Sequence, residues 1–213
     1  MNVRSLLSTP IDNLDFAVVD TETTGMYCEH NRIMDIGIVK ISHGEIVLEW
    51  ETLIDPQQEV PYWITKFTNI TTKHVKGKPT FDKVSENIKR HLDNTVFVAH
   101  NVGFDYWFLY NEMRRLKIDF DYPKLCTVLL GRKLLPTLGL ANLDILSDYY
   151  NIQIENRHRA LPDAKATALI FIEFLKLAKS NFDVKTFFDL EKLQKIKIVK
   201  PVNNDVGLFS DKK

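Results

Sequence analysis

The sequence predicts an α/β domain with a mixed central sheet of about five strands flanked by helices. Three strand-like segments come first, and the short turn at 42–44 joins two of them in the manner of an antiparallel hairpin. Helical periodicity then alternates with short apolar runs, which is typical of parallel strands joined by helices. The length of 213 residues fits one large domain with extensions or two small domains.

The expected strands differ in their apolar pattern. The run at 16–19 is short and ends at Asp20, whereas 45–54 alternates apolar and polar residues, as in a strand with one exposed face. The run at 95–99 is apolar throughout, as in a buried strand. We expect strands over residues 16–19, 32–41, 45–54, 95–99 and 124–128.

The expected helices follow apolar spacings of three and four residues. In the first of them Phe81, Val84 and Ile88 share one face. Pro162 suits the first position of the longest one, where a missing N–H has no intrahelical partner to lose. We expect helices over residues 80–92, 103–116, 127–135, 142–150, 162–178 and 183–195.

Composition bounds the domain organisation and the class of protein. Residues 1–14 are expected to form a loose leader, 15–180 the α/β domain, and 181–213 a C-terminal helix with a polar tail. The 28 Lys and Arg residues balance 28 Asp and Glu residues, which argues against a protein that coats nucleic acid by bulk charge. A local basic groove stays compatible with zero net charge.

The two cysteines and the N-terminus indicate the compartment. Cys28 and Cys126 lie far apart without a Cys-x-x-Cys pattern, so neither a disulfide framework nor a zinc site is expected. The residues after Met1 are too short and polar for a signal peptide, and no apolar run reaches the length of a membrane span. We expect a cytoplasmic protein without a membrane anchor.

Asp20 and Glu22 are the first candidate metal ligands. They are two residues apart on an expected strand, so their side chains point to the same face. Two adjacent carboxylates repel each other unless a cation joins them, and hard oxygen ligands suit Mg²⁺ or Mn²⁺. Taken alone, the pair fits a metal site and a strand end with solvated acids equally well.

Three further residues complete a candidate site. Asp105 follows the buried strand and opens a helix, at the sheet end where α/β proteins place their sites, although an acid there can also complement the helix dipole. His158 precedes Asp163 by five residues, and an imidazole beside a carboxylate ligand suits metal-assisted hydrolysis with a general base. Alone, that pair is more often a helix cap and a surface histidine.

The order Asp-x-Glu, Asp, His-x4-Asp resembles the DnaQ-like (DEDDh) 3′–5′ exonucleases. The blocks at 20–25 and 100–105 look most like the proofreading exonuclease of bacterial DNA polymerase III, either the epsilon subunit or the PolC-type domain. The resemblance spans about residues 14–177 and implies a ribonuclease H-like fold. One departure is Asn69, which stands where relatives usually have glycine, and asparagine tolerates the left-handed backbone of such a turn.

The resemblance implies a metal-dependent 3′–5′ exonuclease that releases nucleoside 5′-monophosphates from DNA with two Mg²⁺ ions, for which Mn²⁺ can substitute. It implies that Asp20, Glu22 and Asp163 hold one metal, and that Asp20 bridges to a second metal supported by Asp105. His158 is then the base that takes a proton from the attacking water. We expect its loop, which lacks evident anchors, to order only when substrate and metals bind.

The resemblance also implies substrate contacts. The backbone around Thr23 and Thr24 would touch the terminal nucleotide, and His100 and Asn101 are candidate phosphate contacts or supports of the metal ligands. His100 is at least as well explained as a hydrogen-bonded structural histidine.

Cations and aromatic residues near these blocks allow further contacts with a strand. Arg159 or Arg157 is expected to contact phosphate, although basic clusters are usually solvated surface. Tyr62, Trp63 and Phe67 could stack on bases, but their spacing favours core packing.

Partners and rival functions complete the predictions. The expected partners are a single-stranded DNA 3′ end and the DNA polymerase III catalytic subunit. The Leu208-Phe209 pair in the tail at 204–209 weakly resembles a sliding-clamp-binding peptide, against the alternative of a frayed terminus. The rival functions are an RNA exonuclease on the same fold, of the RNase T or oligoribonuclease type, and a non-catalytic scaffold that binds the replisome.

Overall fold

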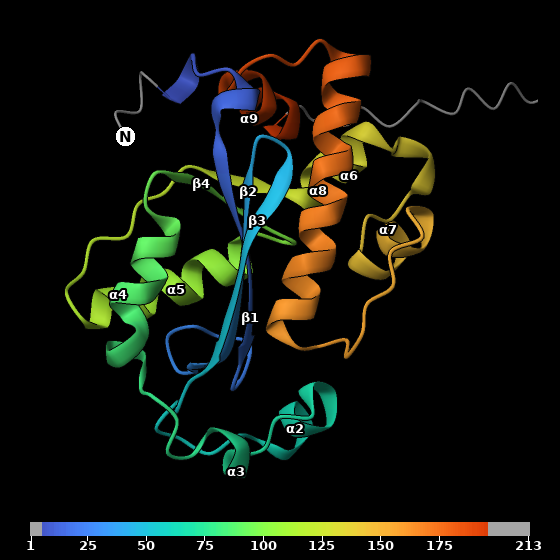
Figure 1. Ribbon diagram of the computed structural model, residues 1–213. Coiled ribbons are helices and arrows are strands. Elements are labelled where there is room, and N and C mark those ends of the chain that lie inside the picture. The colour runs from blue at the N-terminus through green and yellow to red at the C-terminus, as the bar shows by residue number, and fades with distance from the viewer. Residues whose placement is uncertain (1–5, 196–213) are drawn as a thin grey trace, which may run out of the picture.

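The structure of the protein, a computed structural model, describes residues 6–195 and contains the predicted mixed five-stranded sheet (Figure 1). The strands lie in the order β3-β2-β1-β4-β5. Antiparallel pairing joins β1 to β2 and β2 to β3, whereas β4 is parallel to both β1 and β5. Their bounds are β1 Asp15–Thr23, β2 Ile33–Ser42, β3 Glu45–Leu53, β4 Thr95–Ala99 and β5 Lys124–Cys126.

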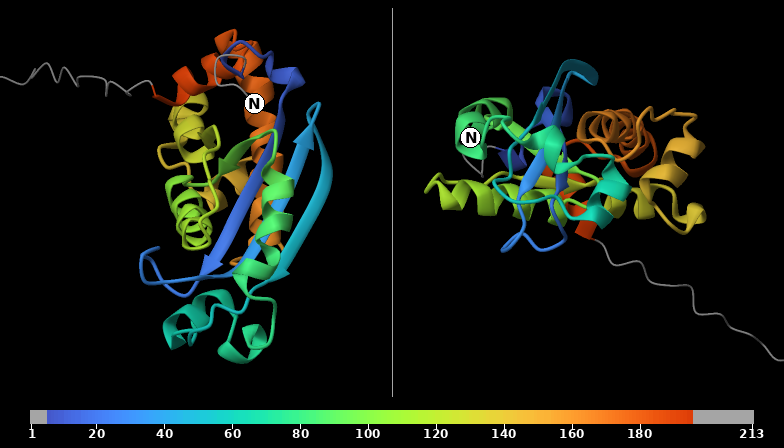
Figure 2. Two further views of the ribbon diagram at one scale, coloured as in Figure 1. Left: turned by 90° about the vertical axis from the view of Figure 1, so that its left-hand side faces the viewer. Right: turned by 90° about the horizontal axis from the view of Figure 1, so that it is seen from below.

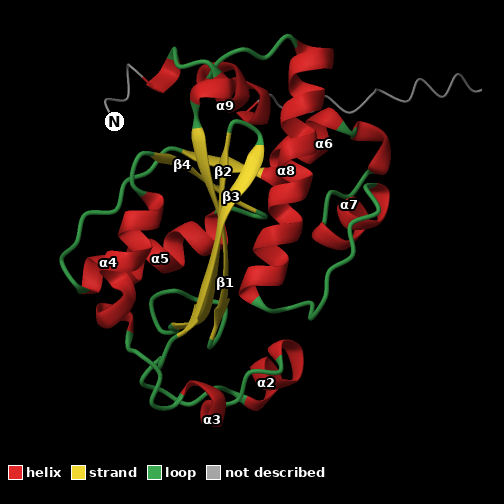
Figure 3. Ribbon diagram, viewed as in Figure 1, coloured by secondary structure: helices red, strands yellow, loops and turns green. Residues whose placement is uncertain are grey.

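The helices cover the sheet on two sides (Figure 3). Their bounds are α2 Tyr62–Thr68, α3 Thr72–Val75, α4 Phe81–Leu92, α5 Gly103–Arg115, α6 Thr127–Leu134, α7 Leu143–Tyr149, α8 Ala160–Phe182 and α9 Phe187–Lys195. Single-turn 3-10 helices occur at Ile11–Asn13 and Pro136–Leu138. The two short helices α2 and α3 have no counterpart among the predicted helices, because seven and four residues are too few to show a periodicity.

Alternation along β1 separates two hydrophobic cores. Phe16 and Val18 pack with α6, α7, α8 and α9, whereas Ala17 and Val19 pack with α4 and α5 on the other face. A smaller third cluster lies under α2 and α3, which sit beyond one end of the sheet while α9 sits at the opposite end (Figures 1 and 2). The end of the sheet near α2 is where the candidate site lies.

Two element boundaries differ from prediction and matter for the site. β1 continues to Thr23, beyond the apolar run at 16–19, and Asp20 and Glu22 both lie on the strand, as expected. α8 begins at Ala160, which makes Pro162 its third residue. Proline is still tolerated there because the N–H groups of the first turn have no intrahelical acceptor. The left-handed turn predicted at Asn69 is confirmed, with φ at 59°.

The prediction of a loose leader over residues 1–14 is wrong for its described part. Leu6, Ile11 and Leu14 are buried in the core that includes α9. The Ile11 N–H donates to the Lys185 carbonyl at 3.0 Å, and Phe187 N–H donates to the Thr9 carbonyl at 3.2 Å. This segment pairs with residues far along the chain, which local sequence patterns do not reveal. The tail at 204–209 lies outside the described residues.

The part of the chain that the structure describes contains no helix long and apolar enough to span a membrane.

Gly37 lets α8 approach the sheet closely. A Cβ atom at this position would lie 2.5 Å from the backbone of both Ala160 and Leu161. Only glycine leaves room for the first turn of α8 against β2, and Asp163 follows within that turn. The glycine therefore fixes the depth at which one candidate ligand enters the site.

Gly37→Ala is expected to lower the free energy of unfolding by about 1–3 kcal/mol, because the added methyl group forces α8 away from β2. Urea unfolding followed by circular dichroism measures the change. Gly103→Ala is the matched control, since a Cβ at Gly103 meets no atom within 4 Å. Equal stability of Gly37→Ala and wild type would contradict the close-approach argument.

Candidate active site

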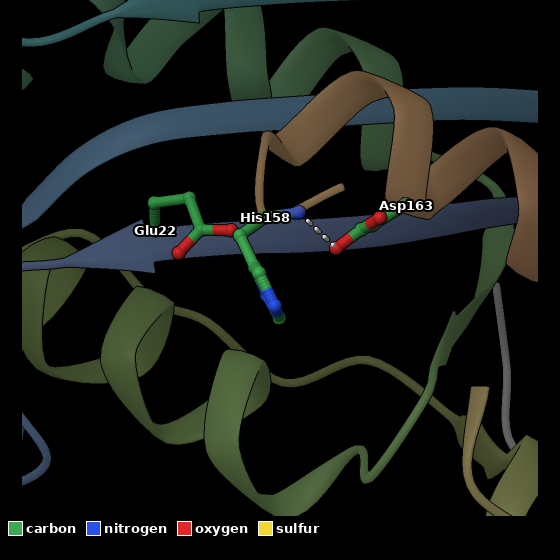
Figure 4. A group of neighbouring side chains, drawn as sticks. All are labelled: Glu22, His158 and Asp163. Carbon is green, nitrogen blue, oxygen red and sulfur yellow. Dashed lines mark hydrogen bonds between the residues drawn. The ribbon is translucent and has the colours of Figure 1, made fainter. Parts of the chain in front are cut away.

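Three of the predicted residues converge at the end of the sheet (Figure 4). Glu22 comes from β1, Asp163 from the start of α8, and His158 from the loop that precedes α8. One potential ligand atom from each lies within 4.8 Å of the other two. Residues separated by more than a hundred positions thus form one compact group of two carboxylates and an imidazole.

Asp20 of β1 and Asp105 of α5 add two further carboxylates to this group. Asp105 is buried in the first turn of α5, where its Oδ1 accepts hydrogen bonds from the Thr21 N–H at 2.9 Å and the Thr21 hydroxyl at 2.8 Å. These bonds anchor α5 to the residue between Asp20 and Glu22. The negative charges of Asp105, Glu22 and Asp163 all act on Asp20.

Burial raises the pKa of all four carboxylates, and the charge of neighbouring acids adds to the effect at Asp20 and Glu22. Burial, then the charges of Asp163, Asp35 and Asp105, raises the pKa of Glu22 to about 8. Burial raises the pKa of Asp105 to about 7 and that of Asp163 to about 6. Burial, then the charge of Asp105, raises the pKa of Asp20 well above its usual range. Such a cluster binds a proton or a cation strongly at neutral pH.

Arg157 is the cation nearest to these acids. Its guanidinium pairs with Asp163 Oδ2 and with Asp144 Oδ1, the latter at 2.8 Å. The other oxygen of Asp163, Oδ1, is buried and has no hydrogen-bond partner within residues 6–195. A buried carboxylate oxygen without a partner is costly, so this atom is available to a ligand.

A fifth acid, Asp35, supports the site and escaped the sequence predictions. It lies opposite Glu22 in the β1–β2 pairing and is completely buried. Its Oδ2 accepts from Arg159 Nε at 2.8 Å and from the Ala160 N–H at 3.4 Å. The signal was a lone acid in the otherwise apolar run Ile33-Met34-Asp35-Ile36.

Glu112 is a second buried acid that the sequence predictions missed. It is 1% exposed on α5 and receives Arg32 in two hydrogen bonds of 2.7 and 2.9 Å. Arg115 lies 3.4 Å from the same carboxylate. This paired charge ties α5 to the start of β2, and so helps to hold Asp105 against β1. An acid inside a helix that is apolar almost all round was the available signal.

The loop that carries His158 is anchored, contrary to the prediction that it lacks anchors. The His158 N–H donates to Asp163 Oδ2 at 3.2 Å, and the neighbouring arginines bind Asp144 and Asp35. The His158 ring lies against Phe67 of α2 with 3.8 Å between ring centroids. Burial and the charge of Arg157 lower the pKa of His158, so the ring is neutral at pH 7 and can accept a proton.

The predicted substrate contacts are placed as follows. Thr23 and Thr24 are buried, and Thr24 exchanges hydrogen bonds with the Arg32 backbone at 2.9 Å. His100 Nδ1 lies 2.9 Å from the Thr127 hydroxyl, and burial lowers the pKa of His100 to about 4, as in a structural histidine. Asn101 is an exposed residue in a left-handed turn. Contacts of these residues with substrate stay predictions.

Arg159 faces the site but is already paired. Its Nε binds Asp35, so a phosphate contact by Arg159 would have to be made alongside this ion pair and also stays a prediction.

The residues present fit divalent cations. Carboxylate oxygens are the preferred ligands of Mg²⁺ and Mn²⁺. Glu22 and Asp163 lie close enough to share an ion, and Asp163 offers a buried oxygen that no hydrogen bond uses within the described chain. Cations would also relieve the repulsion that adds to the raised pKa values of Asp20 and Glu22.

Comparison with known proteins identifies the family. The family RNase_T, described as an exonuclease, matches residues 17–171. The chain belongs to this exonuclease family. All five predicted catalytic positions fall within the matched stretch, and membership implies dependence on divalent metal ions. The prediction of a DnaQ-like 3′–5′ exonuclease with a ribonuclease H-like fold is confirmed.

Relatives lie among the DNA polymerase III proteins. The chain is 36% identical over 204 residues to the DNA polymerase III PolC-type of Clostridium perfringens, covering 91% of this chain but only 14% of that protein. It is 32% identical over 189 residues to the DNA polymerase III subunit epsilon of Aquifex aeolicus, covering 86% of this chain and 93% of that subunit.

Solved structures share the fold. Exonuclease X in complex with 5′ overhanging duplex DNA has a TM-score of 0.67 at 23% identity, with 84% of this chain and 99% of that one covered. E. coli Exonuclease I in complex with a dT13 oligonucleotide has a TM-score of 0.69 at 18% identity, with coverages of 80% and 43%.

Glu22→Gln is expected to stabilise the metal-free protein at pH 8 but not at pH 5. The pKa of Glu22 rises from 4.5 to about 8 on folding. Its contribution to the free energy of unfolding is therefore fully present below pH 4.5 and is lost as the pH rises through 8. In EDTA, the melting temperature of Glu22→Gln should exceed that of wild type by about 2–4 °C at pH 8. Glu59→Gln, at an exposed glutamate, is the control, and a difference independent of pH would contradict the expectation.

Proposed function

We propose that this 3′–5′ exonuclease acts on DNA, hydrolysing the 3′-terminal phosphodiester to release nucleoside 5′-monophosphates, and that it serves proofreading during replication or repair. The observation that carries the chemistry is the grouping of Glu22, His158 and Asp163 within 4.8 Å, with Asp20 and Asp105 in the same cluster of charge. This arrangement supports a site in which metal ligands lie beside a neutral base.

Two Mg²⁺ ions, replaceable by Mn²⁺, would be held by the four carboxylates. Asp20, Glu22 and Asp163 would hold one ion, while Asp20 would also reach a second one supported by Asp105. When bound, paired divalent ions stabilise charge on the attacking and leaving oxygens of such a displacement. Arg157 pairs with Asp163 in this structure, so its guanidinium would have to share or release that carboxylate.

His158 would act as the general base. Its lowered pKa leaves the ring ready to take a proton from the attacking water at neutral pH. Asp163 holds the His158 backbone at 3.2 Å, and the ion pair of Arg159 with Asp35 fixes the next residue. The backbone that carries the imidazole is therefore held at His158 and at the next residue. The Thr23–Thr24 backbone, His100, Asn101 and Arg159 would contact or support the terminal nucleotide.

The relatives favour DNA and a replication partner. Two of them are named as DNA polymerase III proteins, and a similar solved structure holds duplex DNA. We propose the DNA polymerase III catalytic subunit as a partner, in the cytoplasm. Clamp binding through 204–209 is a weaker proposal that rests on the sequence alone. These names support an RNA exonuclease less well than a DNA exonuclease. The presence of all five predicted catalytic residues argues against a non-catalytic scaffold.

His158→Asn and Asp20→Ala are expected to lower the rate of 3′-end hydrolysis by at least about 100-fold, because the first removes the general base and the second a bridging ligand. Shortening of 5′-labelled single-stranded DNA in Mg²⁺, in Mn²⁺ and in EDTA measures this, with labelled RNA in parallel. EDTA should abolish the activity.

The matched control is His43→Asn in the β2–β3 turn. Both histidines have a positive φ, 64° at His158 and 50° at His43, which asparagine tolerates. His43→Asn should leave the rate unchanged. A wild-type protein that shortens neither polymer with either metal would overturn the proposed function, and preference for RNA would overturn the proposed substrate.

A further inference from the structure

Helix α2 presents aromatic side chains to solvent, contrary to the prediction that they pack in the core. Tyr62 is 73% exposed, Trp63 55% and Phe67 58%. The inward face of the helix is instead formed by Ile64 and Thr68, of which Ile64 joins the small hydrophobic cluster beneath it. We call these three exposed aromatic residues of α2 the α2 aromatic face.

The α2 aromatic face begins at the catalytic base. The Phe67 ring lies against His158 with 3.8 Å between centroids and 34° between planes. Trp63 stands one helical turn before Phe67, on the same side of α2 and further from His158. Figure 1 shows α2 beyond the sheet end, below the start of α8. Phe67 therefore joins the α2 aromatic face to the candidate active site.

The segment that carries this surface is basic. Residues 60–80 include Lys66, Lys73, Lys76 and Lys78 but no acid. None of these four lysines forms an ion pair with any residue between 6 and 195. Lys66 lies over the Tyr62 ring at 5.2 Å from its centroid. Unpaired cations interleaved with exposed rings are the combination that binds single-stranded nucleic acid, because cations meet phosphates and rings stack on bases.

We propose that Trp63 and Phe67 form a stacking platform for the bases of single-stranded DNA that lie upstream of the 3′-terminal nucleotide. The inference rests on the proposed function, since that function places the 3′ end at Glu22, His158 and Asp163. With the end held there, the strand leaves past Phe67 and then Trp63, while the lysines meet its phosphates. A protein docking on α2 would compete with the strand for the ring that touches His158, so a DNA occupant is favoured.

Trp63→Ala is the decisive variant, because Trp63 is exposed and Phe67 also supports His158. Fluorescence anisotropy of 5′-labelled dT12 and dT2 with Ca²⁺ in place of Mg²⁺ gives the dissociation constants. Trp63→Ala should weaken binding of dT12 by roughly 5- to 100-fold, since stacking contributes about 1–3 kcal/mol per base. The loss for dT2 should be much smaller, and Trp63→Phe should recover most of the dT12 affinity.

Phe188→Ala is the matched control, since Phe188 is 50% exposed on α9 at the far end of the molecule. It should leave the dT12 affinity within about twofold. The platform would be overturned if Trp63→Ala bound dT12 as tightly as wild type does. It would also be overturned if the substitution weakened the affinities for dT2 and dT12 equally. If dT12 binding depends on Trp63 but the wild-type protein cleaves no DNA, only the proposed function is overturned. If the wild-type protein cleaves DNA but Trp63→Ala leaves the dT12 affinity unchanged, only the platform is overturned.

Discussion

Mutual repulsion among acids at one end of the sheet is the constraint around which this protein is organised. Asp20, Glu22, Asp105 and Asp163 come from three elements. Burial raises the pKa of each, and the charge of neighbouring acids raises those of Asp20 and Glu22 further. Folding therefore works against electrostatics at this place, and the opposing energy comes from apolar packing elsewhere. A site assembled at such cost is poised to take up cations, which is what membership of a metal-dependent exonuclease family requires.

The surrounding structure offsets this repulsion with hydrogen bonds and close packing that hold the acids in position. Thr21 donates two hydrogen bonds to Asp105. Because Asp20 and Glu22 flank Thr21 on β1, these bonds set the position of Asp105 relative to both acids. The missing side chain of Gly37 lets α8 carry Asp163 close to β2. Asp35 holds Arg159 and the first N–H of α8, which fixes the end of the loop that bears His158. These supports rigidify ligands that would otherwise separate, and rigid positioning is what hydrolysis at a strand end requires.

The chain shares the exonuclease domain with much longer relatives and with a relative of similar length. It spans 14% of the Clostridium perfringens protein but 93% of the Aquifex aeolicus subunit. The surface of this chain carries the aromatic face of α2 next to His158. Bulk charge is neutral, so a strand is gripped locally, by rings and lysines beside the site. This division between a shared catalytic centre and a local grip lets one chemistry serve different nucleic-acid partners.

The sequence by itself determined the fold family, most of the sheet and the candidate site, because Asp20, Glu22, Asp105, His158 and Asp163 sit at fixed points of strong local patterns. Only the tertiary structure decided what supports them. Asp35 and Glu112 find Arg159 and Arg32 across long stretches of chain, and no local pattern encodes such pairings. The same holds for the leader against α9 and for the exposed rings of α2. Whether an apolar side chain is buried depends on what packs over it, and that is settled only when distant elements meet.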